Sequence, residues 1–291
     1  MPPIEYFQYH SALLITAAGL LGLVLGSFLN VVIHRLPRML EREWREQCRD
    51  LCGRPNGPGD EAPFNLMVPR SRCPDCGHPI SALENIPVLS YLVLRGRCSA
   101  CGTHISARYP LIELLTAVLS AAVAWRFGPT WQTVAALALT WALISLSMID
   151  LEHQILPDNI TLPFLWLGLA LSLFGLFTDT RSSIIGALAG YLSLWAVYKL
   201  FKAATGKEGM GYGDFKLLAL LGAWLGWRSV PLIILLSSVV GAGTGIAMLA
   251  GGRHTRSQPI PFGPYLAAAG WLALLFGAPI LDAYWRWMMI H

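Results

Sequence analysis

Two acidic residues stand beside long apolar stretches of this sequence. Asp150 follows the apolar run 131–149, and Asp214 opens a second run directly after Gly213. An ionisable side chain next to a membrane-spanning segment is costly and usually serves a function. Two carboxyl groups that share one proton can activate water, one as general base and the other as general acid. The sequence therefore predicts a catalytic aspartyl pair. Two independent boundary charges, with Asp214 capping the helix that it opens, remain an alternative.

Four cysteines form a second candidate site. They occur as two Cys-x2-Cys pairs separated by 21 residues, and they are Cys73, Cys76, Cys98 and Cys101. This spacing predicts a tetrahedral zinc site with four sulfur ligands, which leaves no open position for a catalytic water. We therefore expect structural zinc and disfavour a zinc hydrolase. The glycine after each pair allows the left-handed turn that such a knuckle requires.

Other residues near these cysteines are expected to lie outside the ligand set. His78 and His104 follow the two pairs, but four sulfurs already complete the site. Cys48 and Cys52 form a separate Cys-x3-Cys pair. Without two further ligands they are expected to be ordinary reduced thiols, and a second half-site is the alternative.

The composition is that of a polytopic membrane protein. Of 291 residues, 55% are hydrophobic and only 13% are charged, against about 25% charged residues in soluble domains. The first apolar run is expected to be a retained helix and not a cleaved signal peptide, because no basic segment precedes it. Eight spans are predicted, near 11–33, 110–126, 131–149, 160–177, 183–201, 214–227, 229–250 and 264–281.

The distribution of basic residues predicts the orientation of these spans. Most Lys and Arg residues near span ends fall in the connections 34–109, 150–159, 202–213 and 251–263. Cytoplasmic loops carry such an excess, so these connections are predicted to be cytoplasmic and both termini external. Asp150 ends the third span and Asp214 begins the sixth, so both are predicted at the cytoplasmic membrane boundary.

Five motifs, in this order, carry a resemblance to a known family. They are the segments Gly26–Pro37, Glu84–Leu92, Asp150–Asp158, Gly209–Ala219 and Pro259–Tyr265, of which the fourth contains Gly-Tyr-Gly-Asp. Together they cover about residues 20–270 and resemble the bacterial prepilin peptidases, a family of intramembrane aspartyl proteases.

The resemblance implies an all-α polytopic fold with a cytoplasmic four-cysteine zinc-binding loop. It implies that Asp150 and Asp214 are catalytic and that Cys73, Cys76, Cys98 and Cys101 bind zinc. It further implies cleavage of the short basic leader of prepilins and pseudopilins at the cytoplasmic face of the bacterial inner membrane. The new amino terminus would then be N-methylated with S-adenosylmethionine. No glycine-rich nucleotide-binding fingerprint locates a site for that methyl donor.

The predicted domains are a first transmembrane helix (1–33), a cytoplasmic zinc-binding loop associated with methyl transfer (34–109) and a transmembrane protease core (110–291). A transporter is the alternative from another class, but it would place its acids near the bilayer midplane. A nucleic-acid-binding knuckle is disfavoured, because 34–109 holds 11 basic against 8 acidic residues, which is a weak electrostatic footprint. The predicted partners are prepilin-type substrates and the lipid bilayer, with no nucleic acid.

Several charged residues keep more than one interpretation. Glu113 lies inside a span and is expected to pair with Arg108 or to line the substrate groove. Lys216 is expected either to hold a nearby carboxylate ionised or to reach the headgroups. The three remaining residues lie after the third span: Glu152 and His153 are expected to be solvated, with tuning of the aspartyl pair as the alternative, and Asp158 is expected to cap the fourth span.

Overall fold

The computed structural model describes residues 11–52, 64–81, 83–207, 209–251 and 261–290. Expectations that involve residues 1–10, Arg253, Arg256, Pro259 and Ile260 lie outside these ranges. The described chain is helical, and its only extended pairings are two isolated bridges. The predicted all-α fold is confirmed. The chain forms two compact units, residues 1–129 and 130–291, which are considered separately.

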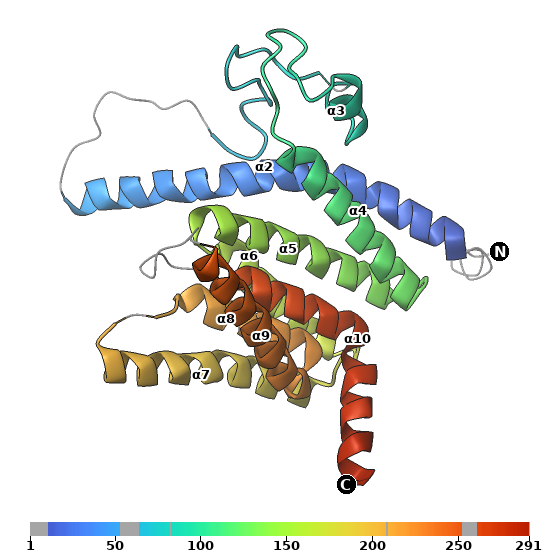
Figure 1. The fold of residues 1–291 in the computed structure, drawn as a ribbon, viewed down its shortest axis with the longest axis vertical. Coiled ribbons are helices and arrows are strands. Elements are labelled where there is room, and N and C mark those ends of the chain that lie inside the picture. Colours follow the sequence, from blue (N-terminus) through green and yellow to red (C-terminus); the bar gives the residue numbers. More distant parts are fainter. Residues whose placement is uncertain (1–10, 53–63, 82, 208, 252–260, 291) are drawn as a thin grey trace. The chain divides into compact units, whose positions relative to one another are not determined.

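A helix is present at each predicted span (Figure 1). These helices are α2 (Ser11–Leu51), α4 (Arg108–Phe127), α5 (Trp131–His153), α6 (Asp158–Ser172), α7 (Thr180–Thr205), α8 (Tyr212–Leu225), α9 (Val230–Ala250) and α10 (Gly263–Ile290). A short helix, α3 (Leu89–Val93), lies in the connection between α2 and α4, and a single 3-10 turn (Trp227–Ser229) precedes α9.

Five helical segments of the described chain are long and apolar enough to cross a membrane. They are Ser11–Leu51, Arg108–Phe127, Trp131–His153, Thr180–Thr205 and Trp227–Met248. By contrast, α6 and α8 have 15 and 14 residues. At 1.5 Å per residue they rise about 21–22 Å, less than the hydrocarbon thickness of about 30 Å. The total of eight spans therefore stays a prediction.

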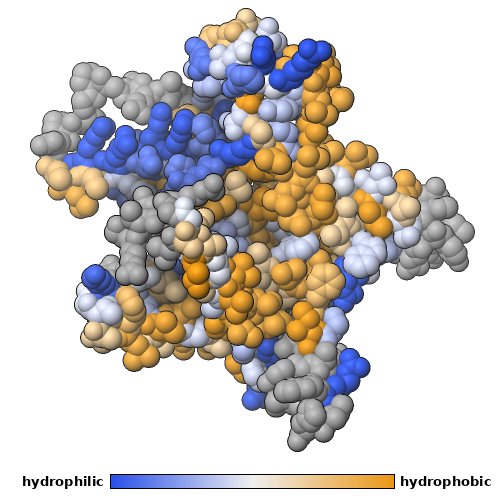
Figure 2. Space-filling model, in the orientation of Figure 1, coloured by the Kyte–Doolittle hydropathy of each residue, from blue (hydrophilic) through white to orange (hydrophobic). Residues whose placement is uncertain are grey.

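The first unit is built on the crossing of α2 and α4. Gly22 and Gly26 of α2 let the helices touch, because a Cβ atom on Gly26 would lie 2.7 Å from the Cα of Glu113. Helix α2 continues without a break through Pro37 to Leu51. The charged stretch 38–46 therefore belongs to the same helix as the apolar run that precedes it. Figure 2 shows this half of α2 as hydrophilic and the helix surfaces elsewhere as largely hydrophobic.

The second unit is built around α8, whose residues 217–224 are all buried. Its backbone touches α7 where Gly222 faces Gly186, since a side chain on either glycine would collide with the other's carbonyl group. The Ser183 hydroxyl of α7 donates to the Ala223 carbonyl at 2.6 Å. The Trp224 indole of α8 donates to the Phe164 carbonyl of α6 at 2.8 Å. Because its neighbours enclose α8, their packing holds Asp214, in the first turn of this helix, in one place.

Large apolar side chains remain exposed on the long helices. They include Leu20, Val24 and Phe28 on α2, Leu188, Leu192 and Val197 on α7, and Leu235, Val239 and Ile246 on α9. Soluble monomers rarely expose contiguous apolar surface of this extent. These helix faces are suited to contact lipid.

Candidate active site and metal centre

Asp150 lies in the last turn of α5, where the helix ends with Gln154 in the left-handed conformation. Its side chain is only 6% exposed. The carboxylate oxygen Oδ2 accepts a hydrogen bond from the backbone N–H of Gly263, the first residue of α10, at 3.0 Å. The end of α5 and the start of α10, far apart in sequence, therefore meet at this carboxyl group.

Asp214 lies in the first turn of α8 and is 7% exposed. The N-cap position of this helix is Gly211, which has no side chain to cap it, so the alternative in which Asp214 is itself the N-cap residue is wrong. Its carboxyl group is buried inside the unit, next to the Gly211 backbone and close enough to Asp150 for the two carboxyl groups to interact electrostatically.

Leu156 shows how closely the two acids are grouped. Its side chain packs against Gly213, where a Cβ atom would lie 2.8 Å from the Leu156 Cβ, and also against Gly263, where a Cβ atom would lie 3.3 Å from Cδ1. Gly213 immediately precedes Asp214, and Gly263 bonds to Asp150. The structure thus brings both sequence-predicted acids into one buried site formed by α5, α8 and α10.

The nearby charged residues form a separate ion pair. Lys216 Nζ lies 2.7 Å from both carboxylate oxygens of Asp158. The N-cap of α6 is Pro157, without a side-chain cap, so the expected capping role of Asp158 is wrong. Lys216 joins the starts of α8 and α6. Glu152 and His153 are exposed on the last turn of α5, in agreement with the expectation that they are solvated.

Within the first unit, the two Cys-x2-Cys pairs adopt the same local structure. In the first, Gly77 has φ 72° and its N–H donates to the Cys73 carbonyl at 3.0 Å. In the second, Gly102 has φ 74° and its N–H donates to the Cys98 carbonyl at 2.9 Å. The predicted left-handed turns are confirmed. One antiparallel bridge closes each knuckle, Arg72 with Pro79 and Arg97 with His104.

The four sulfur atoms lie where a tetrahedral ion requires them. Cys73 and Cys101 are 3.8 Å apart, Cys76 and Cys98 are 3.9 Å apart, and all four sulfurs lie within 4.8 Å of one another. Four sulfurs about 2.3 Å from a zinc ion would be separated by about 3.8 Å in a regular tetrahedron. The cluster fits a metal ion of this size, and Cys48 and Cys52, both exposed, are not part of it.

The environment of the thiols favours a cation at their centre. Hydrogen bonding with the side chain and backbone of Thr103 lowers the pKa of Cys101 to about 6. For Cys76, the largest single influence is a backbone hydrogen bond with His78, which lowers the pKa. Desolvation and the three neighbouring sulfurs together outweigh this bond and raise the pKa of Cys76 to about 12. Because the thiolate is the metal-binding form of cysteine, binding of a cation would displace the proton from Cys76.

Glu84 holds the two knuckles together. Its carboxylate accepts hydrogen bonds from the Ser99 hydroxyl and, at 2.8 Å, from the Ser81 backbone N–H. His78 Nε2 lies 3.6 Å from the same carboxylate. The bond from Ser99, followed by those from Ser81, lowers the pKa of Glu84 to about 2. The residue thus stays ionised and links the second knuckle to the chain that follows the first.

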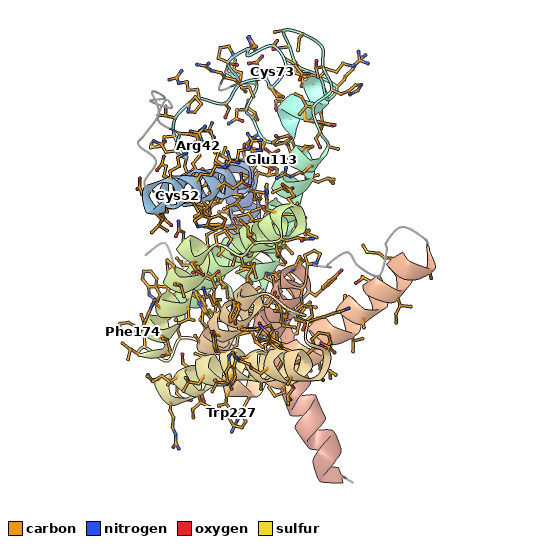
Figure 3. All side chains as sticks on the ribbon, turned by 90° about the vertical axis from the view of Figure 1, so that its left-hand side faces the viewer. Arg42, Cys52, Cys73, Glu113, Phe174 and Trp227 are labelled. Atoms are coloured by element: carbon orange, nitrogen blue, oxygen red, sulfur yellow. The ribbon has the colours of Figure 1, made fainter. Side chains whose placement is uncertain are left out.

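Two buried charges attach this segment to the helices of the first unit. Glu113 of α4 accepts a hydrogen bond from the Val88 backbone N–H at 2.7 Å. Arg35 of α2 donates to the carbonyls of Asn65 at 2.9 Å and Pro69 at 2.6 Å. Figure 3 labels Glu113 on α4 and Cys73 in the four-cysteine segment. Glu113 therefore anchors the segment, a role that the sequence interpretation did not include.

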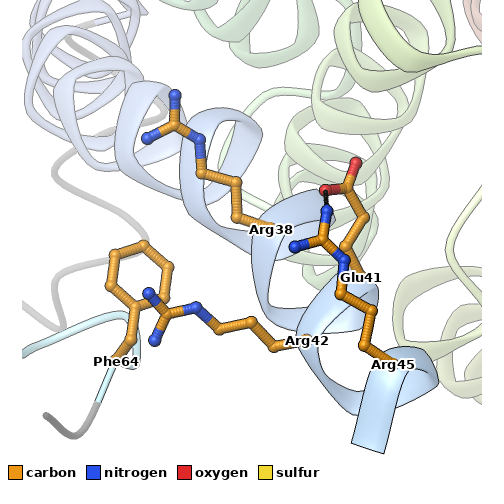
Figure 4. A pocket seen from close by; sticks show the side chains of 5 residues that line it. All are labelled: Arg38, Glu41, Arg42, Arg45 and Phe64. Atoms are coloured by element: carbon orange, nitrogen blue, oxygen red, sulfur yellow. Dashed lines mark ion pairs between the residues drawn. The ribbon is translucent and has the colours of Figure 1, made fainter. Parts of the chain in front are cut away.

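The second half of α2 also lines a cavity of about 260 Å³, together with Phe64 (Figure 4). The guanidinium carbon of Arg42 lies 4.5 Å from the centre of the Phe64 ring, and Arg45 lies 3.8 Å from Glu41. Among the described residues, Glu41 is the one carboxyl group that lines this cavity, so they do not form the paired acids that hydrolysis of the aspartyl type requires there.

Gly263 is the site residue that sequence reasoning missed. The motif that contains it was recognised only as part of a resemblance, without a role. A Gly-Pro pair at the start of an apolar segment is a signal for a helix start, but nothing local indicates that its N–H would face Asp150, 113 residues earlier.

Comparison with known proteins gives a consistent result for both units. The model of the bacterial peptidase A24 N-terminal domain matches residues 20–127, and that of the type IV leader peptidase family matches residues 137–246. The chain is 60% identical to a prepilin leader peptidase/N-methyltransferase of Aeromonas hydrophila, with 94% of this chain and 92% of the relative aligned. It is 55% identical to the protein of the same name in Pseudomonas aeruginosa, with 98% of each aligned. No solved structure matches the chain.

We predict that the protein binds about one metal ion per chain through the four cysteines, because a closed tetrahedral site uses four protein ligands. Elemental analysis of the purified protein should show this ion, and the double substitution Cys73→Ser/Cys98→Ser should remove it. Cys48→Ser/Cys52→Ser is the matched control and should retain it. An unchanged metal content after the first double substitution would rule out the site.

Proposed function

Because the chain belongs to the type IV leader peptidase family, we propose that it removes the leader of prepilins and pseudopilins and then N-methylates the new amino terminus. The relatives named above are called prepilin leader peptidase/N-methyltransferases and align over nearly the whole chain. The observation that carries the protease assignment is the meeting of two buried acids from α5 and α8 at one site.

Asp150 and Asp214 are the proposed catalytic pair. Two carboxyl groups in a site of low polarity cannot both ionise easily, so they share a proton. In this state the ionised carboxylate takes a proton from water as the water attacks the peptide carbonyl. The protonated carboxylic acid gives a proton to the departing nitrogen. Gly211, three residues before Asp214, carries no side chain and has no close neighbour on that side, which leaves room at this end of α8 for an extended peptide.

Zinc is the proposed ion of the four-cysteine cluster, and its role there is structural. Thiolate ligands and tetrahedral geometry favour zinc, and the closed set of Cys73, Cys76, Cys98 and Cys101 leaves no position for water. S-adenosylmethionine is the proposed methyl donor, which supplies an electrophilic methyl group to the amine. The order of reactions is then determined by chemistry, because the amine exists only after the leader is removed.

The protein is proposed to lie in the bacterial inner membrane with its active site at the cytoplasmic face. The excess of Arg and Lys in alternate connections supports this orientation. The proposed functional division is a first transmembrane segment (1–33), a zinc-binding loop (34–109) and a protease core (110–291), whereas helix α2 continues to Leu51 and α4 belongs to the first compact unit. The acids Asp150 and Asp214 both belong to the second compact unit, and the cysteines belong to the first.

We predict that Asp150→Ala and Asp214→Ala each lower leader cleavage by at least about 10²-fold, the usual contribution of acid–base catalysis. Asp→Asn at either position should be nearly as damaging, because the amide cannot exchange the proton. The assay incubates purified enzyme with a full-length prepilin and measures leader loss by mass.

Asp179→Asn is the matched control for the loss of one carboxylate. Asp179 caps α7, accepting a hydrogen bond from the Ser182 N–H at 2.8 Å, and asparagine caps a helix equally well. The control should cleave like the wild type. Wild-type cleavage by either alanine variant at Asp150 or Asp214 would refute the catalytic pair.

We further predict that loss of the zinc ligands harms methyl transfer at least as much as cleavage. Metal binding supplies folding free energy to small four-cysteine modules, and the segment that they shape is the proposed methyl-transfer region. Cys73→Ser/Cys98→Ser enzyme would be given a pilin that is already cleaved and unmethylated, and methyl incorporation would be measured. Full methylation by enzyme that is demonstrably metal-free would disprove this link.

A further inference from the structure

The position of Asp150 on its helix is electrostatically unfavourable. It lies in the last turn of α5, three residues before the helix ends at His153, and the C-terminal end of a helix carries a partial negative charge. The side chain is also almost completely buried. Among the described residues, no Lys or Arg forms an ion pair with it. The carboxylate therefore needs another source of positive potential.

The start of α10 provides that source. The first N–H groups of a helix have no acceptor within the helix and form its partially positive end. The N–H of Gly263, the first residue of α10, donates to Asp150 Oδ2 at 3.0 Å in a buried environment. This bond offsets the unfavourable end of α5 and also fixes one of the two carboxylate oxygens in space.

The start of α10 is held firmly by its neighbours. Tyr265 accepts a hydrogen bond from the Thr244 hydroxyl of α9 at 2.8 Å. Leu266 is completely buried, and Gly270 packs directly against the Leu221 side chain of α8. A donor on so well packed a helix end is preorganised, which makes it suited to hold a catalytic group.

Glycine is required at position 263 by space and not by backbone conformation. Its backbone does not lie in the left-handed region, so other residues could adopt the same dihedral angles. A Cβ atom, however, would lie 2.7 Å from Asp150 Oδ2 and 3.2 Å from its Cγ. Any side chain would therefore push the carboxyl group away from its present position.

We propose that Gly263 is a positioning residue of the active site, which holds Asp150 Oδ2 with its backbone N–H and leaves Oδ1 for the water and the shared proton. The proposal rests on the proposed function of Asp150 as a catalytic residue. It makes the start of α10 a third component of the site, beside the two helices that supply the acids.

Two substitutions test the two parts of this role. Gly263→Ala keeps the N–H but adds the colliding Cβ atom. Gly263→Pro adds a Cβ atom at the same place and also removes the N–H, so its additional loss relative to Gly263→Ala reports the hydrogen bond; proline is well tolerated at the first position of a helix. Both variants should lower kcat for prepilin cleavage by about 10²-fold, the effect expected of a small displacement of a catalytic group, with KM unchanged.

Gly277→Ala is the matched control on the same helix. A Cβ atom there would make only an ordinary contact, 3.8 Å from the Ala273 Cβ, so kcat should equal that of the wild type. Methylation of a pilin that is already cleaved, together with the thermal unfolding of the purified protein, should be unchanged in all three variants. These two measurements separate displacement of Asp150 from general loss of structure.

The outcomes distinguish this proposal from the one on which it rests. If the wild type does not cleave prepilin, or if Asp150→Ala still does, the proposed function fails. If Asp150→Ala is inactive while either Gly263 variant turns over like the wild type, only the role of Gly263 is overturned. It is also overturned if the Gly263 variants lose cleavage, methylation and the folded state together, because Gly263 would then be purely structural.

Discussion

The burial of two carboxyl groups governs the arrangement of the second unit. Removing a carboxylate from water costs several kcal/mol unless hydrogen bonds or charges compensate it. Asp150 obtains its compensation from the start of α10, and Asp214 lies at the start of its own helix, where the partial positive charge is favourable. The packing of α8 against α7 at Gly222 and Gly186 then determines where Asp214 lies. The same helix ends thus stabilise the two buried carboxyl groups and determine where they lie.

In the first unit, the segment between α2 and α4 is organised by cysteines and charged side chains. This segment is too small for an extensive core, so the four cysteines and charged hydrogen bonds organise it. The cysteines bring the knuckles together, Glu84 bridges them, and Glu113 and Arg35 attach the segment to α4 and α2. Glu113 and Arg35 both bond to backbone N–H or carbonyl groups of the segment. These bonds therefore depend on the course of the segment's backbone and not on its side chains at those positions.

Much of this organisation was predictable from local sequence. The apolar runs predicted the helices, and the spacing of Cys73, Cys76, Cys98 and Cys101 predicted their cluster, because both depend on short-range patterns. The continuation of α2 beyond residue 33 was not predicted, because the apolar run ends there and charged residues follow, so only tertiary context shows that the helix goes on to Leu51. A nearby carboxylate was one expected partner of Lys216, but neither its identity as Asp158 nor the Gly263 bond to Asp150 was predicted. The two contacts join residues 58 and 113 positions apart, and only tertiary packing determines such contacts.

The central claim is that Asp150 and Asp214 act as one catalytic unit. The most direct measurement compares single-turnover prepilin cleavage by Asp150→Ala, Asp214→Ala and the double variant over long incubations. Residues that act together give strongly non-additive losses. The account predicts that the double variant cleaves no more slowly than the slower single variant. A double variant whose loss equals the product of the two single losses would show that the two acids act independently, and would contradict the account.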